Sequence, residues 1–139
     1  MKDFAGRTAV VTGGGTGMGR ELVRQLVAEG CHVAMCDVAA DTMAETVALC
    51  KADGLPQGLR VTAHIADVSD ESQMRRFRDE MAEQHQTEAV HLLFNNAGVG
   101  HTPQPLDELS DEAFDRIANV NMRAIYLMSK AFVPAMKAQ

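Results

Sequence analysis

Glycine and threonine recur at fixed intervals in residues 12–19, directly after a short apolar run. The pattern is T-G-x-x-x-G-x-G, with Thr12, Gly13, Gly17 and Gly19 at its fixed positions, and no register of the loop fits G-x-G-x-x-G. Glycines let a backbone approach a ligand closely. A helix that starts there offers free N–H groups and its positive dipole end to an anion. The spacing therefore predicts a loop that binds a dinucleotide diphosphate, with a merely flexible turn as the alternative.

A carboxylate follows the second apolar run of the chain. Asp37 lies 18 positions after Gly19, where it can accept hydrogen bonds from both hydroxyls of an adenosine ribose and would repel a 2′-phosphate. Residues 14–16 and 38–40 contain no basic side chain that would attract such a phosphate. The pattern favours NAD over NADP, and the alternative is an ordinary solvated aspartate at a strand end.

A second Asp follows the third apolar run, in the pair Asp67-Val68. Its carboxylate can accept a hydrogen bond from the adenine amino group while the valine packs near the ring. A loop aspartate that caps the next helix is an equal reading of the same residues.

Amides occur at two further places. Residues 95–98, with the sequence N-N-A-G, follow the fourth apolar run, and the small residues there would let the backbone approach a cofactor. Asn121 lies between Ile117 and Ile125 on an apolar helical stripe that begins at Phe114 and is expected to be buried. Asparagine is disfavoured there because its side chain competes for backbone groups. We expect this amide to organise water or bend the helix beside an active site, and a solvated stripe edge is the alternative.

The remaining chemically active residues predict little. The five histidines have no metal-ligand spacing, so we expect no metal site, and His101 is interpreted as a plain loop residue. Cys31, Cys36 and Cys50 are odd in number and lack C-x-x-C spacing, which favours reduced thiols in the cytoplasm.

Strands and helices must alternate to position these motifs, and that order is typical of a parallel sheet covered by helices. Helix one has an expected buried stripe that includes Met18, and Asp70 with Gln73 resembles a capping box. We expect strands at about 8–12, 32–36, 60–65 and 90–94, and helices at about 17–29, 41–52, 70–86 and from Ser110 nearly to the C-terminus.

The composition sets the broad class. With 139 residues, 46% hydrophobic and 23% charged, the chain suits one globular domain. A net charge of −6 argues against nucleic acid or an anionic membrane as partner. No apolar stretch approaches the ~20 residues that span a bilayer, and the start lacks the apolar segment of a signal peptide.

Together these motifs resemble those of the short-chain dehydrogenase/reductase family, over essentially the whole chain. The resemblance implies a three-layer α/β Rossmann-type fold with strand order 3-2-1-4. It also implies NAD-dependent hydride transfer between a secondary alcohol or ketone and nicotinamide. The implied catalytic residue is Asn121. The implied cofactor-binding residues are Thr12, Gly13, Thr16, Gly17, Met18, Gly19, Asp37, Val38, Asp67, Val68, Asn96, Ala97 and Gly98.

The resemblance also defines what this sequence lacks. Family members place a serine after the next strand and a Tyr-x-x-x-Lys acid/base pair on the helix beyond it. Tyr126 and Lys130 satisfy that spacing, but they follow Asn121 on the same helix, so we expect them not to be catalytic. We therefore expect residues 1–139 to be one NAD(P)-binding Rossmann domain, truncated after the fourth βα unit and inactive alone.

Three further expectations concern function and partners. The alternative function is a non-catalytic nucleotide-binding or interaction module, and an extended relative of the epimerase type is less favoured because its loop reads T-G-x-x-G-x-x-G. The substrate is a small alcohol or ketone of unspecified identity. In the family, the helix that corresponds to the last one of this chain packs across a subunit interface. We therefore expect a homo-oligomer in which Phe132 and Met136 contact the partner.

Overall fold

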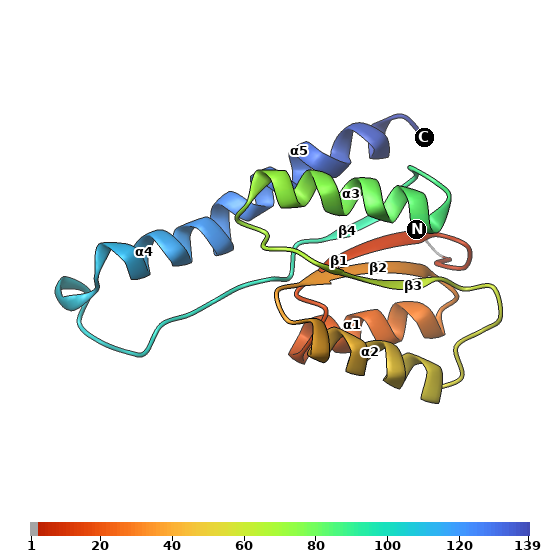
Figure 1. The fold of residues 1–139 in the computed structure, drawn as a ribbon, viewed down its shortest axis with the longest axis horizontal. Helices are drawn as coiled ribbons and strands as arrows, with labels where there is room; N and C mark the ends of the chain where they lie inside the picture. The colour runs from red at the N-terminus through yellow and green to blue at the C-terminus, as the bar shows by residue number, and fades with distance from the viewer. Residues whose placement is uncertain (1–2) are drawn as a thin grey trace.

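Four parallel strands in the order β3-β2-β1-β4 form the centre of the molecule (Figure 1). The computed structural model describes residues 3–139. The elements are β1 (Thr8–Thr12), α1 (Gly17–Ala28), β2 (His32–Asp37), α2 (Ala40–Ala52), β3 (Val61–Ile65), α3 (Glu71–His85), β4 (Leu92–Phe94), a 3-10 turn (Leu106–Glu108), α4 (Asp111–Ala118), a π turn (Asn119–Arg123) and α5 (Ala124–Lys137).

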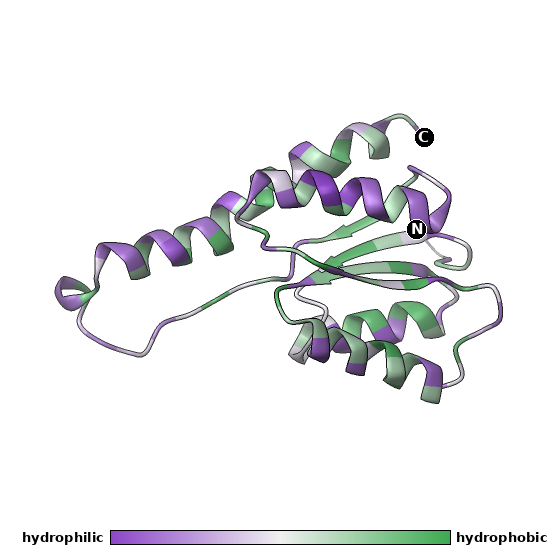
Figure 2. Cartoon of the chain, in the orientation of Figure 1, coloured by the Kyte–Doolittle hydropathy of each residue, from purple (hydrophilic) through white to green (hydrophobic). Residues whose placement is uncertain are grey.

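Helices cover both faces of the sheet, with α1 and α2 on one side and α3 and α5 on the other (Figure 1). The central strands β1 and β2 are mostly apolar on both faces, so their successive residues enter different cores (Figure 2). Val10 and Cys36 pack towards α3 and α5, whereas Val11 and Met35 pack towards α1 and α2. The expected three-layer α/β fold and strand order are confirmed.

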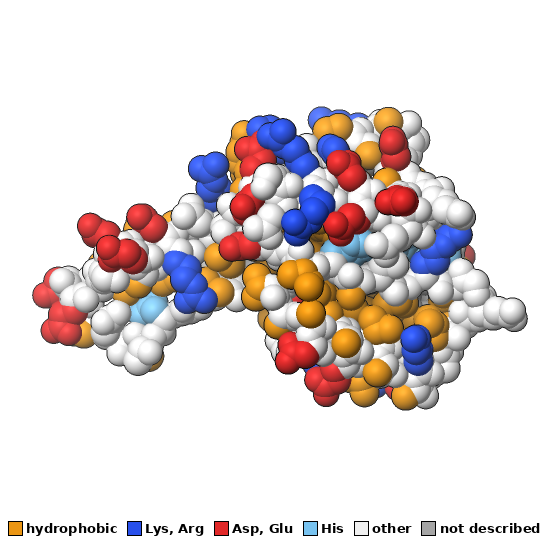
Figure 3. Space-filling view, viewed as in Figure 1, with side chains coloured by type: hydrophobic (Ala, Val, Ile, Leu, Met, Phe, Trp, Pro, Cys, Tyr) orange, Lys and Arg blue, Asp and Glu red, His pale blue; other side chains and the backbone are white. Residues whose placement is uncertain are grey.

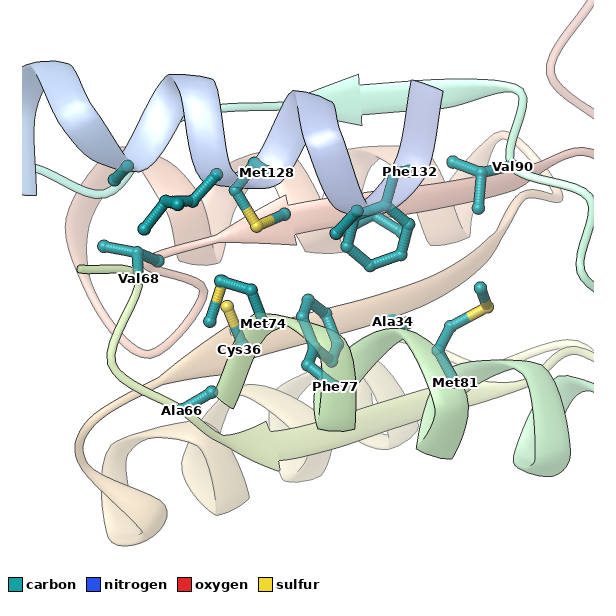
Figure 4. Close-up of a cluster of buried hydrophobic side chains, with 14 residues drawn as sticks. Ala34, Cys36, Ala66, Val68, Met74, Phe77, Met81, Val90, Met128 and Phe132 are labelled. Carbon is teal, nitrogen blue, oxygen red and sulfur yellow. The ribbon is translucent and has the colours of Figure 1, made fainter. Parts of the chain in front are cut away.

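The core beneath α3 and α5 is built around two aromatic rings (Figure 4). Phe77 of α3 meets Phe132 of α5 edge to face, with ring centroids 5.5 Å apart, and both side chains are fully buried. The expectation that Phe132 contacts a partner subunit is therefore wrong, because its ring belongs to this chain's own core. Met136 is partly buried against the same cluster.

The expected single last helix is interrupted. A π turn over Asn119–Arg123 separates α4 from α5, and the extra residue in that turn shifts the buried stripe. Phe114 and Ile125, which the sequence pattern placed on the buried face, are 59% and 47% exposed. After the turn the helix buries Leu127 and Met128.

Local signals at the helix ends agree with the structure. The Asp70 carboxylate accepts from the backbone N–H groups of Ser72 and Gln73, and the Ser110 hydroxyl accepts from Ala113 N–H. The expected capping box is only half formed, because the Gln73 side chain accepts from the Asp67 N–H at 2.9 Å and not from the Asp70 N–H. Gly30 adopts a φ of +81° after α1, a conformation that favours glycine. Cys31, Cys36 and Cys50 are free and buried. Within residues 3–139, no helix combines the length and apolarity that crossing a bilayer requires.

Candidate cofactor-binding site

A cleft of about 440 Å³ opens where the carboxyl ends of the strands meet the start of α1. Ligands of open α/β sheets bind at this edge. The cleft is lined by Gly13, Thr16, Gly17, Met18, Gly19, Asp37, Val38, Ala66, Asp67, Val68, Asn96, Ala97, Gly98, Val99, Arg116 and Val120.

The start of α1 lacks the usual N-terminal capping. Thr16 occupies the N-cap position, but its side chain makes no capping hydrogen bond, and the first turn contains no acidic residue. By contrast, the Asp70 carboxylate accepts from the first N–H groups of α3, and Glu71 places a negative charge beside the positive dipole end of that helix. The first N–H groups of α1 and its positive dipole end therefore remain available to an anion in the cleft.

Two glycines of the loop are required by its geometry. Gly17 has a φ of +55°, which side chains disfavour, and a Cβ there would project into open space beside the cleft. At Gly19 a Cβ would clash with the carbonyl oxygen of Gly13, so only glycine lets α1 start this close to the end of β1. Met18, expected on the buried stripe of the helix, is instead 82% exposed and lines the cleft.

Side chains from outside the motif hold the glycine loop in place. The Arg20 guanidinium donates to the Gly15 carbonyl at 2.6 and 3.1 Å and pairs with Glu45 of α2 at 2.7 Å. The buried Thr46 hydroxyl donates to the Gly14 carbonyl at 2.9 Å. These contacts fix the loop before any ligand binds, and the sequence pattern gave no signal for them because both partners lie outside the glycine motif.

Asp37 lies at the end of β2 and lines the cleft. One carboxylate oxygen accepts from the Gly15 N–H at 3.0 Å, and the other accepts from the Val38 N–H at 2.7 Å. These bonds orient the carboxylate beside the loop. The oxygen bonded to Val38 also accepts from the Ala39 N–H at 3.4 Å. The oxygen bonded to Gly15 can still accept from a further donor, so the group can recognise a hydroxyl.

Asp67 and Val68 follow β3 and also line the cleft. One Asp67 oxygen accepts from both the N–H and the hydroxyl of Ser69, at 2.8 and 2.7 Å. The alternative that Asp67 caps the next helix is wrong, because Asp70 caps α3. Asp67 instead shapes the loop, and its second carboxylate oxygen accepts no hydrogen bond from residues 3–139.

The ends of β1 and β4 are joined through Thr12. Its hydroxyl oxygen accepts from the N–H groups of Asn96 and Ala97, at 3.0 and 2.9 Å, and donates to the Phe94 carbonyl at 3.4 Å. The Asn96 amide donates in return to the Thr12 carbonyl at 3.0 Å. Thr12 is buried and does not line the cleft itself, so it positions the residues that do.

Asn121 lies in the π turn and is joined to the loop after β4. Its amide oxygen accepts from the Val99 N–H and its amide nitrogen donates to the Val99 carbonyl, both at 2.8 Å. The helix is irregular where Asn121 was expected to bend it. The side chain does not line the cleft, and its hydrogen bonds hold Val99, which does.

Tyr126 and Lys130 lie one turn apart on α5, away from the cleft lining. The Tyr126 side chain is 60% exposed. The Lys130 ammonium, 5.9 Å from the Tyr126 ring centroid, pairs with Glu71 at 2.7 Å. Hydrogen bonding to that carboxylate raises the pKa of Lys130. The ion pair joins Lys130 to α3, the helix that contains Glu71.

The structure brings most of the expected site residues together. Only Thr12 and Asn121 lie behind the cleft, and each holds residues that line it. Four lining residues carried no sequence signal that we used: Ala66, Val99, Arg116 and Val120. Val99 and Val120 adjoin motif residues in the sequence, whereas Arg116 comes close only through the path of α4.

Comparison with known proteins identifies the family. A sequence model of the short chain dehydrogenase family matches residues 7–139. The chain therefore belongs to the short-chain dehydrogenase/reductase family, whose members are oxidoreductases with a Rossmann nucleotide-binding fold.

Three relatives illustrate the match. An uncharacterised oxidoreductase of Bacillus subtilis, YxbG, is 36% identical over 98% of this chain and 48% of its own length. The structure of a family member from Burkholderia phymatum in complex with NAD has a TM-score of 0.89, with 33% identity over 100% of this chain and 47% of that one. A metagenomic oxidoreductase in complex with NADP has a TM-score of 0.86, with 30% identity over 97% and 58%. The chain spans about half the length of its curated relatives.

Proposed function

We propose that residues 1–139 are the cofactor-binding part of an NAD-dependent short-chain oxidoreductase. The observation that carries this proposal is the combination of an uncapped α1 N-terminus with the Asp37 carboxylate in one cleft. The first would bind the diphosphate, and the second would bind the adenosine ribose. The nicotinamide of the bound cofactor would donate or accept hydride, with a secondary alcohol or ketone as the other reactant.

The proposed preference for NAD rests on Asp37. Its carboxylate, oriented by the Gly15 and Val38 N–H groups, would accept hydrogen bonds from ribose hydroxyls and repel a 2′-phosphate. We further propose that Asp67 and Val68 receive the adenine, with the free carboxylate oxygen of Asp67 accepting from the amino group. Residues 96–98 and the loop glycines would complete the cofactor contacts.

We propose that the acid/base pair of the reaction is not among residues 1–139. The Lys130 ammonium is paired with Glu71, and Tyr126 lies outside the cleft lining, which supports the expectation that these two do not act on substrate. Asn121 would contribute to catalysis by position, through its hydrogen bonds to Val99. This chain by itself would bind cofactor and turn over little or no substrate.

The alternative remains a non-catalytic nucleotide-binding module. We also propose a cytoplasmic homo-oligomer, since α4, the π turn and α5 expose large apolar side chains. These are Phe114, Met122, Ile125 and Tyr126. Sedimentation of the purified chain tests this, because a monomer at micromolar concentration contradicts the oligomer.

The decisive experiment is a fluorescence titration of the purified chain with NADH and with NADPH. We expect saturable binding that favours NADH, and Asp37→Ala should reduce or abolish that preference. Asp41→Ala, which removes an exposed carboxylate outside the cleft lining, is the matched control. Binding to neither cofactor contradicts the proposed site, and equal binding to both contradicts the role of Asp37. Dehydrogenase activity that Tyr126→Phe abolishes contradicts the assignment of the acid/base.

A further inference from the structure

Arg116 is the one cationic residue that lines the cleft over residues 3–139, where the lining acids are Asp37 and Asp67. It lies in the last turn of α4, and its side chain is exposed. The 3-10 turn and α4, residues 106–118, form an arm, and Figure 3 shows acidic side chains at its outer end. Acidic residues at that end are Asp107, Glu108, Asp111 and Glu112.

The guanidinium of Arg116 has no bonding partner within the part of the chain that the structure describes. Most of the other arginines are engaged with carboxylates or carbonyls, namely Arg20, Arg24, Arg60, Arg75, Arg76 and Arg78. An arginine with five free donors and a bare planar face, at the rim of a ligand cleft, is available to a ligand.

Arg116 lines the same cleft as Asp67 and Val68, the two residues that follow the loop end of β3. Val120 lies one turn further along the same helical run, on the same side as Arg116. Val120 packs against the core cluster that contains Val68, the residue after Asp67. The ion pair between Lys130 and Glu71 holds α5 against the start of α3 nearby. Arg116 therefore lines the cleft in which the proposed function places the adenine.

We propose that Arg116 is a further cofactor-binding residue, whose guanidinium stacks on the adenine ring at the mouth of the cleft. This role rests on the proposed function, because it requires a dinucleotide with its adenine beside Asp67 and Val68. A planar cation over an aromatic base gains from the electrostatics of the ring and from contact area. A 2′-phosphate would be the other attractive ligand group for Arg116, but Asp37 in the same cleft would repel it.

Ligand titrations of Arg116→Ala and Arg116→Lys test this role. NADH affinity is measured by fluorescence, and ADP-ribose affinity is measured by calorimetry, because ADP-ribose keeps the adenosine and lacks the nicotinamide. Arg116→Ala should weaken both ligands by the same factor, about fivefold, which is typical of an exposed cation over an aromatic ring. Arg116→Lys should recover only part of the loss, because lysine keeps the attraction of a cation to the ring but lacks the planar face that stacks on it. Arg123→Ala, an equal change of charge at an exposed site outside the cleft lining, should leave both affinities unchanged.

The outcomes separate the two proposals. A wild-type chain that binds neither NADH nor ADP-ribose overturns the proposed function and the role of Arg116 with it. A chain that binds both, with affinities that Arg116→Ala leaves unchanged, overturns the role of Arg116 alone. Full recovery by Arg116→Lys, or a larger loss for NADPH than for NADH, also overturns stacking, since either result means that Arg116 acts as a charge.

Discussion

Asn121 in the π turn holds the backbone of Val99 with two hydrogen bonds of 2.8 Å, one accepted and one donated. The residues are 22 positions apart, and this pair joins the irregular part of the last helical run to the loop that closes the cleft. A side-chain amide is the group that can bond both the N–H and the carbonyl of one residue, which explains why asparagine is found on an otherwise apolar stripe.

Replacing Asn121 with leucine, which has a similar shape, should lower the free energy of unfolding by about 1–3 kcal/mol, because two backbone groups of Val99 lose their partners. NADH affinity should fall as well, since Val99 lines the cleft. Urea unfolding and the NADH titration measure the two effects. Asn119→Ala, at an exposed position of the same turn, is the control. Unchanged unfolding and unchanged affinity in Asn121→Leu contradict the positioning role.

Thr12 should be sensitive to loss of its hydroxyl and tolerant of loss of its methyl group. Thr12→Val keeps the shape but leaves the N–H groups of Asn96 and Ala97 without their acceptor, which should cost about 2 kcal/mol in urea unfolding. Thr12→Ser keeps the acceptor and should cost about 1 kcal/mol, for one buried methyl group. An equal loss in both variants means that packing, and not the hydroxyl, joins β1 to β4.

The cysteines should be unreactive in the folded chain. Burial raises the pKa of the Cys31 thiol to about 11 and that of the Cys36 thiol to about 12. Burial also raises the pKa of Cys50. Because the thiolate is the reactive form, a thiol reagent at neutral pH should label these residues only as fast as the protein opens. Rapid labelling of all three without denaturant contradicts the packed core. A chain held in urea is the positive control.

The sequence was sufficient to predict the order of the elements because the strands are mostly apolar and several helix ends carry local signals, such as Asp70, Ser110 and Gly30. It was also sufficient for the cleft residues that belong to motifs, since the carboxyl ends of parallel strands meet at one edge. Asp37 and Asp67 are distant in sequence and line one cleft for that reason.

The remaining features depend on three-dimensional packing. The π turn over Asn119–Arg123 has no signature in helical periodicity, so the buried faces of Phe114 and Ile125 were predicted wrongly. Met18 fits a helical stripe by spacing, but its first-turn position places it over the cleft. Arg116 could not be associated with the cleft from sequence, because the direction of α4 brings it there.

A chain of hydrogen bonds runs from Glu80 through His64 and Thr62 to His85, between α3 and β3. The His64 Nδ1 lies 3.0 Å from the Glu80 carboxylate, and the Thr62 hydroxyl lies 2.9 Å from Nε2 of both His64 and His85. If His64 donates to Glu80, Thr62 must donate to His64 and His85 must donate to Thr62. The Nδ1 of His85 is then an unprotonated atom, buried without a partner.

Burial lowers the pKa of His85 to about 4, with smaller contributions from His32, His64 and Arg60. The folded pKa is below the unfolded value, ~6.5, so His85 costs no stability above pH 6.5. As the pH falls from ~6.5 to ~4 the unfolded chain binds the proton first, and stability should drop by up to about 3 kcal/mol.

Urea unfolding at a series of pH values measures this drop. In His85→Gln most of it should disappear, and a small part should remain because burial also lowers the pKa of His32. His101→Gln, at an exposed position, should retain the full slope. Hydrogen bonds to Lys130 and Arg75 hold the pKa of Glu71 at about 2. The stability that Glu71 contributes is therefore lost mainly below pH ~4, so it can be separated from the effect of His85. An unchanged slope in His85→Gln assigns the acid sensitivity to other groups and contradicts the neutral, buried state of His85.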